Sequence, residues 1–516
     1  MSIHTAAAEA VSTMLPAPEL SGAGGANGNL PTNDELNAAL FGTPPPVELP
    51  PLHSPEEPQA ARAEQPTILT TEKLVDEIIG DAVRLREAAE AEGMPTPVLT
   101  IVAGLPYGEK RGHLLEAIEG YARTGEIPAP YGDTTSYSFG SLVPRSAEAG
   151  VQPRLFLPRE VAEHPDTLAL LEKLGLDPAK TLATGHNLGG IMDDLRAPVL
   201  ERSQLLRRLA DNELIQTQLA NGEGTDGFTE EQIRGELRTI AFEISLMSGR
   251  VAELDRHIDI RLTEEDAKIT AIVATENDNP ETNAVIAMMP TYTYEGAQNT
   301  RRAFTNNLKD VDGLSLHTPR EERRWDEATA RAVWRCAEYF AGRAIPRKLL
   351  VQLGLGQLVG RRLEQIAHPG TVVDGQGPIT AWVKNPGEQE VGVLMSATRG
   401  AEIIDAGKIV AARWGRGLMK FFGQRRLLII DAGSVTVTNP VTGKRETRGN
   451  LDMSTLPTDG TVAATGPRNG VGPVTGAIVL HRAVEAAVEQ FHARPQRPAP
   501  TGVQLPAREH EFAAAA

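Results

Sequence analysis

The residues best suited to chemistry form a basic and aromatic segment between Ala406 and Ile430. No carboxylate interrupts the segment, although the whole chain is acidic. Cations suit contacts with phosphates, and aromatic rings suit stacking on bases. The same side chains would also suit an acidic surface on another subunit. We expect a nucleic-acid or subunit contact, weighed against a plain salt-bridged surface, at Lys408, Arg413, Trp414, Arg416, Lys420, Phe421, Arg425 and Arg426.

A second candidate is a phosphate-binding loop over residues 103–112. It follows an expected strand and opens an expected helix, where backbone N–H groups can hold a phosphate. The glycine spacing is one residue short of a P-loop, and Glu109 stands where the lysine should be. An ordinary strand-to-helix turn is the stronger interpretation. The weaker one, a degenerate phosphate loop, rests on Gly104, Gly108, Lys110 and Arg111.

The remaining polar groups complete no catalytic or metal-binding motif. His186 precedes Asp193 and Asp194, but adjacent residues on a helix point about 100° apart, so both carboxylates do not easily serve one ion. The G-x-S-x-G turn of serine hydrolases is absent from the sequence. Cys336 lies within an apolar helical pattern and is expected to be a buried structural thiol. The sequence thus predicts no catalytic residue, no metal and no cofactor.

Length and composition limit the class of protein. The chain has 516 residues, which favours two to four domains. Its net charge of −17 argues against a protein that coats nucleic acid along its whole surface. With a single cysteine no intrachain disulfide can form. No secretory signal or membrane-spanning run is recognised. A location in the cytoplasm or within a virion or particle is expected, without secretion or a membrane partner.

The pattern of elements predicts a mixed α+β fold, with a helix-rich central region and a strand-rich C-terminal region. A disordered N-terminal arm precedes them because residues 1–66 are rich in proline and acid. The expected divisions are this arm at 1–66, a small α/β region at 67–165, a mainly helical region with a short strand pair at 166–368, a strand-rich region with a closing helix at 369–494, and a disordered tail at 495–516.

Hydrophobic periodicity locates the individual elements. Helices are predicted at residues 71–92, 109–122, 200–219, 230–247, 298–308, 321–341, 348–366 and 475–492. Strands are predicted at residues 98–103, 269–274, 284–289, 379–383, 391–396, 427–430 and 434–438.

These features favour a non-enzymatic, self-assembling structural protein near nucleic acid, such as a viral or phage-type shell or packaging subunit. Its expected partners are other copies of the chain and, as an option, nucleic acid. One alternative is a soluble DNA-associated regulatory or defence protein that uses a basic and aromatic surface within residues 300–430. Another is an enzyme that uses the degenerate phosphate loop at 103–112.

Overall fold

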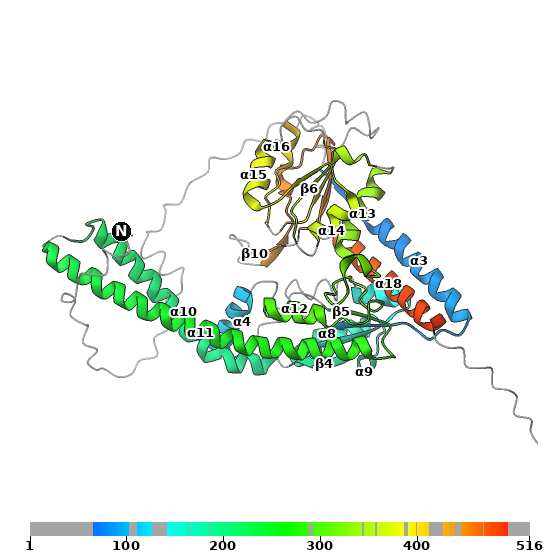
Figure 1. Cartoon of the computed structure of the whole chain (residues 1–516), viewed down its shortest axis with the longest axis horizontal. Helices are drawn as coiled ribbons and strands as arrows, with labels where there is room; N and C mark the ends of the chain where they lie inside the picture. The colour runs from blue at the N-terminus through cyan, green and yellow to red at the C-terminus, as the bar shows by residue number, and fades with distance from the viewer. Residues whose placement is uncertain are drawn as a thin grey trace, which may run out of the picture. The chain divides into compact units, whose positions relative to one another are not determined.

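The protein contains two parallel β-sheets and a pair of long helices (Figure 1). The computed structural model describes residues 66–102, 111–125, 142–163, 165–186, 188–225, 227–287, 293–342, 345–356, 359–385, 391–398, 400–411, 427–433, 435–438, 445–467 and 469–493. The chain divides into two compact units. Among the described residues, one comprises those within 205–250, and the other comprises those within 66–204 and 251–493. Both sheets belong to the second unit.

The larger sheet has six parallel strands in the order β1-β12-β9-β8-β6-β7. These strands are β1 (Thr67–Leu69), β6 (Leu350–Leu353), β7 (Thr371–Val373), β8 (Val393–Ser396), β9 (Leu427–Asp431) and β12 (Val462–Thr465). The chain passes from β6 to β7 on one side and then to β8 on the other side. The strand order therefore reverses at β6, and ligands of open α/β sheets bind beside such a reversal, at the carboxyl ends of the strands.

Helices cover both faces of this sheet because its strands are apolar on both faces. Val351 and Leu353 pack with α15 (Gln376–Lys384) and α16 (Ala406–Ala411). Leu350, on the opposite face, packs with α13 (Ala328–Ala341) and α14 (Gly360–Ala367). Figure 1 shows α15 and α16 on one side of the sheet and α13 on the other. The result is a three-layer α/β/α arrangement.

The smaller sheet has four parallel strands in the order β4-β3-β2-β5. They are β2 (Val98–Val102), β3 (Gln152–Pro158), β4 (Leu182–His186) and β5 (Ala284–Ala287). Its order also reverses, between β2 and β5, but the residues that directly follow these two strands lie outside the described ranges. Short helices surround it, namely α4 (Arg111–Thr124), α6 (Val143–Ala149), α7 (Arg159–Ala162), α8 (Pro165–Lys173), α9 (Pro178–Thr181) and α12 (Tyr294–Arg302).

The helices α10 (Leu188–Ala220) and α11 (Glu230–Asp278) form the long pair. Within the unit that holds the sheets, Arg202 on α10 pairs with Asp255 on α11, with 2.8 Å between Nε and Oδ1. Within the other unit, Asn212 on α10 donates a 3.0 Å hydrogen bond to Glu243 on α11. The two helices are therefore antiparallel neighbours in each unit. Two strands of four residues each, β10 (Val435–Thr438) and β11 (Arg445–Arg448), form a separate antiparallel ribbon.

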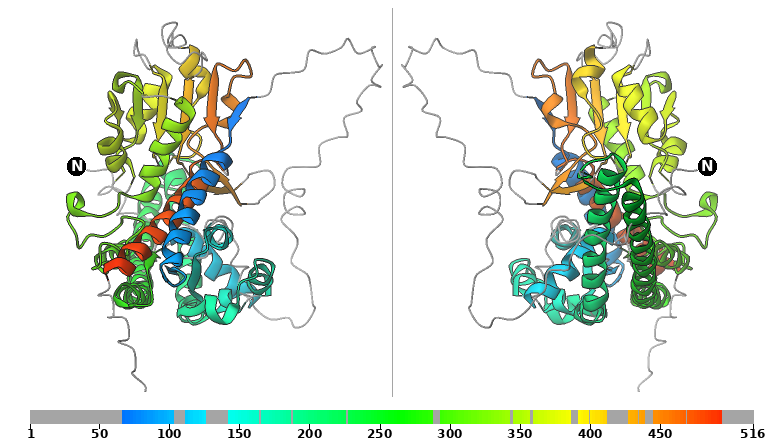
Figure 2. Two further views of the ribbon diagram at one scale, coloured as in Figure 1. Left: turned by 90° about the vertical axis from the view of Figure 1, so that its right-hand side faces the viewer. Right: turned by 90° about the vertical axis from the view of Figure 1, so that its left-hand side faces the viewer.

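Two helices that are far apart in sequence form the central part of the core. α3 (Glu72–Ala91) packs along α18 (Val471–Ala493), and the left view in Figure 2 shows them side by side. Among the described residues, α18 is the one helix long and apolar enough to cross a membrane, and 72% of its most apolar stretch is buried in the protein. Packing against α3 and α13 accounts for this apolar surface.

The predicted mixture of helices and strands is confirmed, but three elements are wrong. Residues 269–274, predicted as a strand, lie inside α11, because Ile269 and Val273 are one helical turn apart on a buried face. Residues 379–383, also predicted as a strand, lie in α15 for the same reason. The predicted helix 348–366 contains β6, a turn and α14. The predicted division between residues 368 and 369 falls between α14 and β7, and the strands before and after it, β6 and β7, belong to the same sheet.

Candidate nucleotide-binding turn

The strand order of the larger sheet reverses at β6, and a glycine-rich turn from Gly354 to Gly360, of which residues 357 and 358 lie outside the described ranges, follows this strand and precedes α14. Gly354 follows β6 with a φ of +91°, and a Cβ there would lie 2.8 Å from the carbonyl oxygen of Ala397. Its backbone N–H donates a 2.8 Å hydrogen bond to Val373 at the end of β7. Gly354 therefore fits between the ends of β7 and β8, where a side chain has no room.

The other end of the turn is just as tightly packed. A Cβ on Gly360 would lie 2.4 Å from the carbonyl oxygen of Gly354. The buried side chain of Gln352 holds both ends, because its Nε2 donates to the carbonyl oxygens of Gly354, at 3.0 Å, and of Gly360. The first turn of α14 consequently lies against the carboxyl end of β6, which is the edge of such a sheet where ligands bind.

Gly356, in the middle of the turn, differs from the two other glycines. It is exposed, its φ lies outside the left-handed region, and the nearest described atom to a Cβ would be the oxygen of Ala397 at 3.8 Å. That separation is an ordinary van der Waals contact. The described fold therefore does not require a glycine at position 356. A ligand that approaches the backbone closely would require one, as the pyrophosphate of a dinucleotide does.

A carboxylate from the next strand borders the turn. Asp374 directly follows β7, and its Oδ1 accepts a 2.8 Å hydrogen bond from the backbone N–H of Leu355. The carboxylate is exposed and lies 20 positions after Gly354. In dinucleotide-binding folds an acidic residue at about this spacing accepts hydrogen bonds from the adenosine ribose. The glycine pattern here, G-x-G-x-x-x-G, has one residue more before its third glycine than the usual G-x-G-x-x-G.

The carboxyl ends of the neighbouring strands are fixed by buried polar side chains. Ser396, which ends β8, donates a 2.6 Å hydrogen bond to Oδ1 of Asn450. Asp431, which ends β9, accepts from the backbone N–H groups of Gly433 at 2.7 Å and Leu451 at 2.9 Å. Burial raises the pKa of Asp431 to about 6, although these hydrogen bonds oppose the shift. These hydrogen bonds hold the carboxyl ends of β8 and β9 at the edge of the sheet that borders the turn.

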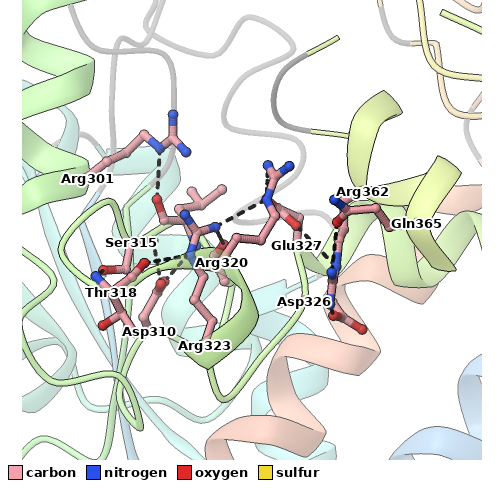
Figure 3. Close-up of polar contacts among 12 residues, drawn as sticks. Arg301, Asp310, Ser315, Thr318, Arg320, Arg323, Asp326, Glu327, Arg362 and Gln365 are labelled. Carbon is pink, nitrogen blue, oxygen red and sulfur yellow. Dashed lines mark hydrogen bonds and ion pairs between the residues drawn. The ribbon is translucent and has the colours of Figure 1, made fainter. Parts of the chain in front are cut away.

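A chain of ion pairs connects α14 with the segment that precedes α13 (Figure 3). Arg362, two residues after Gly360, pairs with Asp326. The adjacent Glu327 is 3% exposed and pairs with Arg320 at 2.7 Å and Arg323 at 3.3 Å. Since one partner lies in the first turn of α14, this network helps to hold the glycine-rich turn in place.

The same segment contains two acidic residues, the buried Asp310 and the half-buried Asp312. Asp310 accepts hydrogen bonds from the backbone N–H groups of Leu314, at 3.1 Å, and Ser315, at 2.6 Å. Burial raises the pKa of Asp310, and burial together with the nearby Asp310 raises the pKa of Asp312 to about 7. Arg482 of α18 donates to the carbonyl oxygens of Val311 and Asp326, which joins this segment to the core.

The candidate residues predicted from the sequence lie elsewhere. Lys408 is exposed on α16 and pairs with Asp405 at 2.7 Å. Arg111 begins α4, with its side chain outside the described set. The rest of both predicted sites also falls outside the described residues, namely Gly104, Gly108, Lys110, Arg413, Trp414, Arg416, Lys420, Phe421, Arg425 and Arg426. The contacts proposed for them stay predictions. Cys336 is fully buried, as expected.

Comparison with known proteins gives structural neighbours only. No protein-family model and no curated protein matches the chain. The bifunctional methylenetetrahydrofolate dehydrogenase-cyclohydrolase of Trypanosoma brucei is similar over 83% of this chain and 99% of its own, with 12% identity and a TM-score of 0.43. The bifunctional enzyme of Campylobacter jejuni is similar over 82% of this chain and 98% of its own, with 12% identity and a TM-score of 0.42. The NAD-dependent 5,10-methylenetetrahydrofolate dehydrogenase of Saccharomyces cerevisiae is similar over 84% of this chain and 100% of its own, with 8% identity and a TM-score of 0.40.

These neighbours correct the expected function. They are dehydrogenase and cyclohydrolase enzymes, whereas the sequence favoured a non-enzymatic, capsid-like shell or packaging subunit. That interpretation is wrong, and the expected location within a virion has no support. The candidate turn described above lies at 354–360, whereas the enzyme alternative placed its phosphate loop at 103–112.

Proposed function

We propose that this protein is an enzyme that binds a nicotinamide adenine dinucleotide at the carboxyl edge of its six-stranded sheet. The observation that carries the proposal is Gly356, a glycine that the described part of the fold does not need, in a turn whose two other glycines it does need. A bound pyrophosphate would lie so close to the backbone at position 356 that a side chain there would displace it.

Each part of the turn has a separate task in this proposal. Gly354 and Gly360 let the chain turn sharply and bring α14 against β6. Backbone N–H groups at the start of α14 then face the pyrophosphate, and the partial positive charge of the helix N-terminus favours its negative charge. Asp374 accepts hydrogen bonds from the ribose hydroxyls. The residues of the turn thus bind and orient, and the bound nicotinamide would supply hydride transfer.

The first experiment measures binding without any assumption about the substrate. NADH would be titrated with the full chain, and the change in its fluorescence would report the dissociation constant. We expect the wild type to bind and Gly356→Ala to bind at least about tenfold more weakly, because a methyl group there displaces the pyrophosphate. Absence of binding by the wild type at millimolar NADH would overturn the proposal.

The control is a glycine with similar freedom away from the turn. Gly80 lies in the middle of α3, and a Cβ there would meet only the end of the Arg84 side chain, at 3.5 Å. Gly80→Ala should bind NADH as the wild type does. Urea unfolding of both variants would show that they are folded. Equal affinity of Gly356→Ala and the wild type for NADH would also reject the proposed role of the turn.

We further propose that such an enzyme works in the cytoplasm.

A further inference from the structure

The end of β7 shows which form of the dinucleotide the turn accepts. We infer that this protein selects NAD(H), with a free ribose 2′-hydroxyl, against NADP(H), with a 2′-phosphate, and that Asp374 is the residue that decides. The inference rests on the proposed function, because it concerns the adenosine ribose of the same cofactor.

Asp374 is well placed to act on the ribose. The adenosine ribose of a dinucleotide lies beside the end of the second strand of the nucleotide-binding unit, which is β7 in this sheet. Asp374 directly follows that strand. Its Oδ1 is fixed by the N–H of Leu355, so the carboxylate is held at the turn while the side chain as a whole stays exposed. A carboxylate accepts hydrogen bonds and donates none, which suits hydroxyl groups.

The same carboxylate would repel a 2′-phosphate, which carries nearly two negative charges at neutral pH. A cation that could offset this charge is missing from the adjoining sequence. Position 355, between the first two glycines, is a leucine, and residues 375–383 contain no lysine or arginine. NADP-binding sites place an arginine close to this position. The negative charge of Asp374, with no lysine or arginine at position 355 or within residues 375–383, therefore favours the cofactor without the 2′-phosphate.

Arg361 is the cation nearest to the turn in sequence, and it does not reverse this preference. It is exposed in the first turn of α14, and its backbone N–H donates to the carbonyl oxygen of Gly356 at 3.2 Å. A cation at this place attracts the pyrophosphate, which both cofactors carry. Its contribution is therefore common to NADH and NADPH, whereas the charge of Asp374 acts on the group in which they differ.

The test compares NADH with NADPH by fluorescence titration of the wild type and of Asp374→Asn. Asparagine keeps an oxygen that can accept the N–H of Leu355 and removes only the charge. We expect the wild type to bind NADH at least about tenfold more tightly than NADPH. In Asp374→Asn the ratio should fall toward one, mainly because NADPH binds more tightly. Glu172→Gln, an exposed carboxylate on α8, should leave the ratio unchanged.

The concentration of salt provides a second readout. Because the discrimination is a repulsion between exposed charges, raising the salt from 0.05 M to 0.5 M should narrow the wild-type ratio and leave that of Asp374→Asn unaltered. Equal or tighter binding of NADPH by the wild type would overturn the inference and leave the proposed function standing. Binding of neither cofactor would instead remove the proposed function, so the two failures are distinguishable.

Discussion

The carbonyl oxygen of Gly354 lies 2.4 Å from the position that a Cβ on Gly360 would occupy. The contact joins the first and last glycines of the turn, and the obstructing atom belongs to the backbone, which cannot rotate away as a side chain can. We expect Gly360→Ala to lower the free energy of unfolding by about 1–3 kcal/mol, the usual cost of inserting a methyl group into a filled space. Urea unfolding would measure it.

Gly80→Ala is the matched comparison for this prediction. The Cβ would be in ordinary contact there, and alanine is the better helix former, so its free energy of unfolding should rise by about 0.5–1 kcal/mol. If Gly360→Ala and the wild type unfold with the same urea midpoint, the close approach of the backbones at Gly354 and Gly360 is not present in solution.

The burial of Asp431 predicts a dependence of stability on pH. Its folded pKa is about 6, above the value near 3.9 of an exposed aspartate, so folding disfavours the charged form. The stability that it contributes when protonated is fully present below about pH 4 and is lost as pH rises to about 6. A difference of about 2 pKa units corresponds to about 3 kcal/mol.

Asp431→Asn isolates this contribution, because other titrating groups are common to both proteins and cancel in the difference. The free energy of unfolding of the variant minus that of the wild type should increase by about 3 kcal/mol from pH 4 to pH 7. Chemical denaturation at several pH values would give the curve. A difference that stays constant with pH would show that the carboxyl group of Asp431 is not buried as described.

The glycine-rich turn can be recognised in the sequence, but it was missed because residues 348–366 were predicted as one continuous helix. Leu349, Leu350 and Val351 are spaced with Leu355 and Val359 in a way that also fits a helix, so residues 348–366 were predicted as one helix. β6 is only four residues long, too short for its periodicity to decide. The glycines at 354, 356 and 360 were the better signal, because a helix interior disfavours them and a strand-to-helix turn uses them.

Other parts of the site depend on packing that the sequence does not reveal. The parallel pairing of β6 with β8 joins residues about 40 positions apart and sets the close approach of Gly354 to Ala397. The partners of Glu327 come from its own segment and from α14. In the sequence alone, Glu327 cannot be distinguished from a solvent-exposed carboxylate, because only the fold brings its arginine partners together and buries it. Sequence reasoning therefore located α3, β2, β8 and α18 and missed the network beside the turn.

Glu327 tests the network of Figure 3. Its carboxylate is 3% exposed and faces Arg320 and Arg323, so Glu327→Gln would leave two arginines without their counter-charge. We expect the free energy of unfolding to fall by about 3 kcal/mol, as is usual when one partner of a buried ion pair is removed. Glu322→Gln, at an exposed position in the same segment, should change it by less than about 0.5 kcal/mol. Equal effects of the two substitutions would contradict the burial of Glu327.

Cys336 provides a probe of the core that needs no substitution. Its side chain is fully buried on α13, and burial raises the pKa of the thiol to about 12, so little thiolate exists at pH 8. A thiol-specific reagent should therefore label the native protein at least about a hundredfold more slowly than the protein unfolded in urea, because labelling requires the core to open. Because the chain has one cysteine, the labelled fraction equals the fraction of molecules in which the core has opened. Complete labelling of the native protein within minutes would place Cys336 at the surface and reject the packing of α13 against α18.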